Sequence, residues 1–238
     1  MHEDHRKRVR ERFLTEGLDN FAPHNVLEFL LFYSIPRRDT NEIAHRLIEK
    51  FGSLGAVFDA DIEELKAVED IGENSAVLLK LIPQLSRRYM VDKLPQDGVF
   101  NSVNKVGNYF IAKYIGHTVE SVYLMLLDNS YRVLNCDIIF TGSVNSAKIT
   151  SRMIIERALR YRATIAVLAH NHPGGVAIPS DADISTTRNL YEALSIVDVC
   201  LLEHLVIAGD KFSTIMAGPL SGLNQAIGKD ELHRFYTE

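Results

Sequence analysis

The second half of the chain alternates short apolar runs with segments whose apolar residues recur at helical spacing. The apolar runs are Ser121–Leu127, Arg132–Phe140, Ala163–Ala169 and Val197–Ile207, and the helical segments are Val103–Ile115, Ser146–Arg160 and Ser180–Leu194. Short apolar runs are typical of buried strands, and a repeat of three to four residues is typical of amphipathic helices. The alternation predicts an α/β fold in which helices flank a mixed sheet.

The pattern before this region predicts helices only. A helical run, Asn25–Ile35, stops before Pro36, and the Asp-x-x-Glu patterns of Asp39–Glu42 and Asp61–Glu64 have the form of capping boxes that open two further helices. A last helix, Asn74–Met90, contains a proline. We therefore expect a small all-α domain over residues 1–92, a linker over 93–100, the α/β domain over 101–223 and a C-terminal tail over 224–238.

Composition places the protein among ordinary globular chains. Its 238 residues are 46% hydrophobic and 24% charged, with a formal net charge of −5, so bulk charge gives no case for strong nucleic-acid binding. The apolar stretches fall far below the roughly 18 residues of a membrane span, so we expect no membrane partner. The charged start Met1–Arg6 lacks the apolar core of a secretory signal. With Cys136 and Cys200 inside apolar runs, the sequence predicts a cytoplasmic protein with reduced thiols.

The pattern that carries chemistry is His170-Asn171-His172-Pro173, which follows the apolar run Ala163–Ala169. Side chains at positions i and i+2 of a strand lie on the same face, so both imidazoles can reach one metal ion. Seven residues separate His172 from Ser180, a favourable helix N-cap, and Asp183 then falls in the first helical turn. Two histidines and an aspartate leave one coordination position for water, which is typical of catalytic zinc.

This spacing resembles the JAMM motif of the JAB/MPN+ metallopeptidases. The fuller strings, His170–Gly175 and Pro179–Thr187, are similar to the bacterial RadC family within that group. RadC-like proteins carry a helical segment of helix-hairpin-helix type before a JAB domain, and this chain has both parts in that order. The resemblance implies a JAB/MPN-like fold and a Zn²⁺ ion held by His170, His172 and Asp183.

The resemblance also implies a mechanism and further site residues. A water activated by the metal would attack an amide carbonyl, and the Ser180 hydroxyl would donate to the oxyanion. A glutamate of the family would accept the proton of that water, and its aligned position here is Asp137, one methylene shorter. Asp137 is thus either a catalytic base or a solvent-facing strand residue. His204 either orients a metal ligand or is a core histidine.

Two further segments depart from the pattern of RadC relatives. Where those relatives carry Pro-Arg-Glu, this chain has Ser151-Arg152-Met153, so a family carboxylate is absent. In the hairpin Glu69–Ala76, Asp70 stands in place of a glycine and Ser75 in place of a lysine. Phosphate binding needs exposed amides and positive charge. The sequence therefore favours a packing or protein-contact role for this hairpin and gives DNA only weak support as a partner.

Two functions remain open at this point. The first is a cytoplasmic zinc-dependent hydrolase that acts on a peptide or isopeptide bond of an unknown peptide or protein substrate. The second is a non-catalytic metal-binding or protein-interaction module associated with DNA repair or recombination. The ligand spacing of His170, His172 and Asp183 motivates the first, which we take as the main hypothesis, while the shortened acid at Asp137 and the altered hairpin motivate the non-catalytic alternative.

Overall fold

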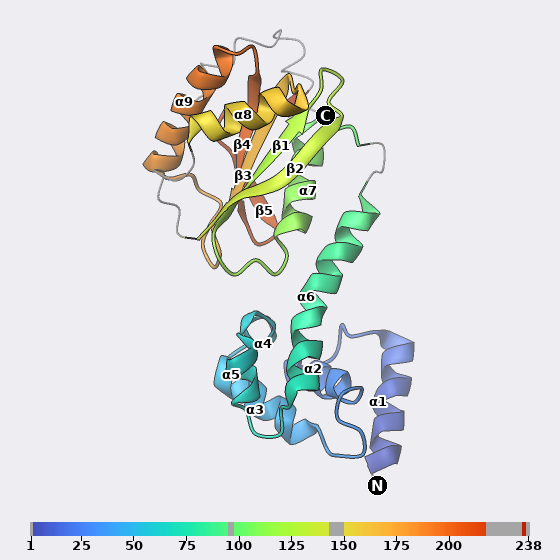
Figure 1. Cartoon of the computed structure of the whole chain (residues 1–238). Coiled ribbons are helices and arrows are strands. Elements are labelled where there is room, and N and C mark those ends of the chain that lie inside the picture. The colour runs from blue at the N-terminus through green and yellow to red at the C-terminus, as the bar shows by residue number, and fades with distance from the viewer. Residues whose placement is uncertain (1, 95–97, 143–149, 218–234, 237–238) are drawn as a thin grey trace. The chain divides into compact units, whose positions relative to one another are not determined.

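The computed structural model describes residues 2–94, 98–142, 150–217 and 235–236, and the chain forms two compact units, residues 1–86 and 87–238. Figure 1 shows the elements of both units along the chain. Within the described ranges, no helix combines the length and the apolar character needed to cross a membrane.

The first unit is built from helices, as the sequence predicts. Its elements are α1 (His2–Glu16), α2 (Pro23–Leu31), α3 (Asn41–Phe51), α4 (Leu54–Asp59), α5 (Ile62–Lys66) and the beginning of α6 (Glu73–Lys93). Fully buried leucines from four of these helices, Leu27, Leu47, Leu65 and Leu79, form the centre of its core. Burial of these side chains is the main force that holds such short helices together, because helices of this length are marginal alone.

One of the two predicted capping boxes forms and the other does not. The Asp61–Glu64 box is present at the start of α5. The Asp39–Glu42 box was predicted wrongly, because α3 begins one residue later with Thr40 as its N-cap. The Thr40 side chain is buried, and its hydroxyl donates to the backbone oxygen of Glu28 at 3.1 Å. This bond to α2 fixes the entry of the chain into α3.

The hairpin between α5 and α6 carries an acid in a left-handed backbone conformation. Asp70 has φ 70°, a region that favours glycine. Its carboxylate accepts hydrogen bonds from Arg38 at 2.7 Å and from Arg46 at 3.2 Å. The guanidinium groups of Arg38 and Arg46 are therefore paired with an acid of the same unit rather than presented to a phosphate.

The second unit is an α/β domain with a five-stranded mixed sheet. Its elements are α7 (Val103–Tyr114), β1 (Ser121–Leu127), β2 (Val133–Thr141), α8 (Ser151–Tyr161), β3 (Ile165–Asn171), α9 (Asp181–Ser195), β4 (Cys200–Ala208) and β5 (Lys211–Thr214). The strand order is β2-β1-β3-β4-β5, in which only β3 and β4 run parallel. Helices α8 and α9 cover one face of the sheet and α7 covers the other (Figure 1).

The central strands explain the apolar runs of the sequence. Every residue of β1 and β3 is buried, because helices cover both faces there. The short strand β5 has no such run, and the sequence analysis did not predict it. Phe235, which belongs to the predicted tail, is 1% exposed and packs in the core on the α7 face.

A buried carboxylate fixes the chain beyond β5. Glu203 lies in β4 and is fully buried. Its carboxylate accepts backbone N–H bonds from Ile215, Met216 and Ala217, and the hydroxyl of Tyr236 donates to it at 2.8 Å. A buried charge is tolerated only when it is paired in this way. The segment after β5 and the C-terminal Tyr236 are thereby attached to β4.

Gly107 in α7 allows the helix to lie directly against β5. A Cβ atom at this position would clash with the ring of Phe212. We expect Gly107→Ala to lower the free energy of unfolding by about 1 to 3 kcal/mol, since overpacking a core costs that much. Denaturant unfolding measures the loss. In a Phe212→Leu background the same substitution should cost clearly less, and an equal cost would contradict the contact.

Candidate metal centre

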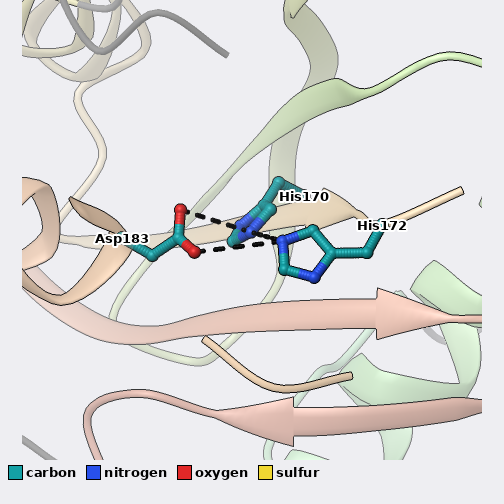
Figure 2. A group of neighbouring side chains, drawn as sticks. All are labelled: His170, His172 and Asp183. Carbon is teal, nitrogen blue, oxygen red and sulfur yellow. Dashed lines mark hydrogen bonds and ion pairs between the residues drawn. The ribbon is translucent and has the colours of Figure 1, made fainter. Parts of the chain in front are cut away.

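The two histidines of the predicted motif lie together at the end of β3. His170 is inside the strand and His172 directly follows it, where its backbone N–H still bonds to the oxygen of Ile207 in β4. The alternation of a strand places both rings on the face covered by α9. Their Nε2 atoms are 3.1 Å apart, and Figure 2 shows the rings converging with Asp183.

The start of α9 supplies the acid. Ser180 is the N-cap, and its hydroxyl accepts the backbone N–H of Asp183, as the sequence predicts. In return, Asp183 Oδ2 accepts the backbone N–H and the hydroxyl of Ser180 at 2.8 and 2.6 Å. This capping box fixes the carboxylate side chain. Asp183 Oδ1 then lies 3.5 Å from His170 Nε2, and Oδ2 lies 3.9 Å from His172 Nε2.

These three separations fit one small metal ion. Ligand atoms about 2.0 to 2.2 Å from a tetrahedral zinc ion are roughly 3.3 to 3.6 Å from one another. The 3.1 Å between the two Nε2 atoms and the 3.5 Å from His170 Nε2 to Asp183 Oδ1 lie close to this spacing, and the other carboxylate oxygen, Oδ2, lies 3.9 Å from His172 Nε2. In the described part of the chain, His170, His172 and Asp183 form the group of three potential ligands whose atoms lie within 4.8 Å of one another.

The hydrogen bonds around the rings leave both Nε2 atoms without a proton in the neutral imidazoles. His172 Nδ1 lies 3.1 Å from the oxygen of Val176, which can only accept, so Nδ1 carries the proton. His170 Nδ1 lies 2.8 Å from His204 Nε2. If His170 Nδ1 is the donor in that pair, His170 Nε2 has no proton. The lone pairs of the two Nε2 atoms then face each other at 3.1 Å beside the Asp183 carboxylate. Such an arrangement is repulsive unless a cation lies between them.

His204 comes from β4 and lies behind His170. It is 5% exposed, and its Nδ1 lies 2.6 Å from the hydroxyl of Thr187 in α9. Burial, and then the proximity of the His170 ring, lowers the pKa of His204 well below the usual histidine value. A neutral ring at this place can accept a hydrogen bond from His170, in line with the predicted orienting role.

Asp183 is held in its charged form. Burial alone would raise the pKa of its carboxyl, but His170 and Ser180 outweigh burial and hold the pKa well below its usual range. Its side chain is only 12% exposed. A partly buried carboxylate beside two imidazole lone pairs is a favourable donor set for a divalent cation.

Asp137 is not brought to this group. It lies on β2 opposite Leu124, and β1 separates β2 from β3. Two strand spacings amount to about 10 Å. The Asp137 carboxylate is instead 3.8 Å from the guanidinium of Arg157 in α8, and it is 54% exposed. The position of Asp137 therefore fits a solvent-facing strand residue better than a catalytic base within reach of the histidines.

Glu120 is an acid that the sequence analysis missed. Val122 lies opposite His170, so Glu120, two residues earlier, comes level with His172 on the same face. Its backbone oxygen accepts the N–H of Gly142 at 2.8 Å, so the ladder of β1 and β2 extends to this residue. The only sequence feature that could have pointed to Glu120 is its place just before the apolar run Ser121–Leu127. The sequence does not show that this run pairs with β3, so it gave no reason to place Glu120 near the histidines.

The amide of Asn171 fixes the backbone on both sides of Glu120. Asn171 Oδ1 accepts the N–H of Ser121 at 2.7 Å, and Nδ2 donates to the oxygen of Val119 at 3.1 Å. Asn171 is 4% exposed and stands between the two histidines in sequence. The same short segment thus carries the two imidazoles and holds the backbone of the neighbouring acid.

Ser180 lies at the open side of the group. Its residue is exposed, whereas the His170 side chain is 3% exposed. The hydroxyl is within 2.6 Å of Asp183, so it sits beside the ligand atoms, where the sequence analysis expected an oxyanion donor. The group is therefore closed on the β4 side and accessible on the side of Ser180 and His172.

The remaining candidates lie outside the group. Cys136 and Cys200 are unpaired thiols, and burial raises the pKa of each to about 11, so neither is a nucleophile near neutral pH. Arg152, in the segment that departs from the RadC pattern, pairs with Glu156 at 2.8 Å on the surface of α8.

Comparison with known proteins gives a consistent identification. The model of the RadC-like JAB domain matches residues 100–218. A UPF0758 protein of Idiomarina loihiensis is 34% identical over 215 residues, which cover 90% of this chain and 96% of that protein. A UPF0758 protein of Pseudoalteromonas translucida is 32% identical over 86% of this chain and 91% of its own length. A UPF0758 protein of Fusobacterium nucleatum is 32% identical over 89% of this chain and 94% of its own length.

The domain match spans α7 to β5, which includes every residue of the candidate metal centre. The mixed sheet with flanking helices is the architecture that the resemblance implied. The chain belongs to the RadC family, and its second unit is a RadC-like JAB domain.

Proposed function

We propose that the RadC-like domain is a zinc-dependent hydrolase that cleaves a peptide or isopeptide bond. The observation that carries the proposal is the convergence of three side chains: the Nε2 atoms of His170 and His172 lie 3.1 Å apart, and the Asp183 carboxylate lies 3.5 Å from the first and 3.9 Å from the second. Three protein ligands with an accessible fourth side are typical of catalytic rather than structural zinc. A zinc ion at these atoms would supply a hydroxide nucleophile at neutral pH, because such an ion lowers the pKa of bound water to about 7.

The protein side chains would handle the proton and the developing charge. Glu120, level with His172 on the same face, would accept the proton of the attacking water and pass it to the leaving amine. The Ser180 hydroxyl, which donates to Asp183 Oδ2 in this structure, would turn to donate to the oxygen of the scissile carbonyl as that oxygen becomes negative. Asn171 would keep the Glu120 backbone in register with the histidines. In this proposal Glu120 has the role that the sequence analysis assigned to Asp137.

The alternative is a non-catalytic module that binds metal or protein in a DNA-repair or recombination assembly. One observation favours it over direct DNA binding: the ion pairs of Asp70 with Arg38 and Arg46 occupy the positive charge beside the hairpin. A module of this kind would keep the metal and show no turnover. The hydrolase and the module would use the same metal ligands. They differ in whether a change of Glu120 alters turnover.

Metal content tests the ligand set. We expect protein purified without chelator to contain about one zinc ion per chain, measured by elemental analysis. His170→Ala and Asp183→Asn should each lose stoichiometric zinc, because two remaining ligands hold the ion poorly. Asp137→Asn is the matched acid control and should keep full zinc content. Zinc-free wild-type protein after reconstitution with the ion would contradict the proposal.

Hydrolysis of a fluorogenic peptide library and of a lysine-linked isopeptide tests the role of Glu120. We expect Glu120→Gln to lower kcat by roughly 10²- to 10⁴-fold, the usual contribution of a general base, with zinc content unchanged. Asp137→Asn should stay within about threefold of the wild type. If the zinc-loaded wild type cleaves neither probe, the module is the better description. If Asp137→Asn is the variant that loses activity, Glu120 is the wrong base.

A further inference from the structure

A buried chain of hydrogen bonds connects two of the proposed metal ligands through residues that touch no metal. The Thr187 hydroxyl donates to the backbone oxygen of Asp183 at 2.6 Å. Thr187 Oγ1 also lies 2.6 Å from His204 Nδ1, and His204 Nε2 lies 2.8 Å from His170 Nδ1. Thr187 is fully buried, and His204 and His170 are 5% and 2% exposed.

The direction of each bond follows from the number of protons available. A carbonyl oxygen only accepts, so the single hydroxyl proton of Thr187 is committed to Asp183. His204 Nδ1 must then donate to Thr187 Oγ1. A neutral His204 has no second N–H, so its Nε2 accepts from His170 Nδ1. The proton of His170 is thereby held on Nδ1, and its Nε2 lone pair is left for a metal.

We infer that Thr187 and His204 are positioning residues that set the tautomer of His170 for metal binding. The inference deepens the proposed function, because it concerns the same site. This series of hydrogen bonds ends at the backbone oxygen of Asp183. The Asp183 residue and the buried His170 ring are therefore fixed relative to each other before any ion binds. Outer partners of this kind fix ring orientation and raise metal affinity.

Removal of the Thr187 hydroxyl should release this constraint. In Thr187→Val, His204 Nδ1 loses its acceptor, and the opposite tautomer of His204 becomes competitive. That tautomer donates from Nε2 to His170 Nδ1 and moves the His170 proton to Nε2, where it blocks coordination. Thr187→Ser keeps a hydroxyl and should keep the wild-type arrangement. Thr186→Val, one residue earlier in α9, is the matched control, because Thr186 is outside the chain of bonds.

Two measurements test the inference, both independent of hydrolysis. Ring nitrogen NMR of the zinc-free protein should show His170 with its proton on Nδ1 in the wild type, Thr187→Ser and Thr186→Val, and a mixture in Thr187→Val. Competition with a chelating dye should show zinc affinity reduced about 10- to 100-fold in Thr187→Val and unchanged in the two controls. Equal affinity and an unchanged tautomer in Thr187→Val would overturn the inference.

A second pair of variants guards against loss of the fold. His204→Gln offers an amide oxygen to His170 Nδ1 and an amide N–H to Thr187, so we expect zinc affinity within a few-fold of the wild type. His204→Leu offers neither and should lose affinity as Thr187→Val does. Equal affinity in both His204 variants would also overturn the inference. If the wild type bound no zinc, the proposed function would fail, while the tautomer measurement would still decide the role of Thr187.

Discussion

Two imidazole nitrogens that face each other without a proton between them need a positive charge. His170 and His172 are placed in this situation by the alternation of β3, and their other nitrogens are occupied by hydrogen bonds to His204 and Val176. A shared proton or a metal ion relieves the repulsion, and the nearby charged Asp183 favours the ion of higher charge. The proposed role of the domain depends on this repulsion between the two Nε2 lone pairs and on its relief by a bound cation.

The side chains that position the proposed metal ligands also stabilise the fold. The Asp183 carboxylate that faces the histidines is the same group that caps α9, so one side chain serves both the helix and the site. Thr187 lies one helical turn further along and bonds to both Asp183 and His204. Because β3 and β4 are adjacent and parallel, His204 reaches His170 from the neighbouring strand. His170 is therefore fixed by a contact with β4, and Asp183 by contacts within α9.

The sequence could predict the parts of the site that depend on local spacing. The i and i+2 positions of His170 and His172, and the three residues from Ser180 to Asp183, belong to one strand and one helical turn, whose geometry the chain itself specifies. The sheet and its helices followed from periodicity in the same way. The Asp39 capping box failed because a contact with Glu28, far away in sequence, moved the start of α3.

Strand order could not be predicted locally, and this decided which acid lies near the histidines. Asp137 and Glu120 both belong to or border apolar runs, and only the pairing of β1 with β3 distinguishes them. Thr187 was missed for a related reason, since its partner His204 is on β4. Residues whose roles depend on non-local pairing gave no pattern of their own in the sequence.

The buried Glu203 has a practical consequence for handling the protein. Its carboxylate adjoins His204 in β4 and takes one of its hydrogen bonds from Tyr236, two residues before the last residue of the chain. Loss of the Tyr236 hydroxyl would leave the buried carboxylate one donor short next to the strand position of His204. A deletion that includes Tyr236 would therefore act far away in sequence, on the strand that carries His204.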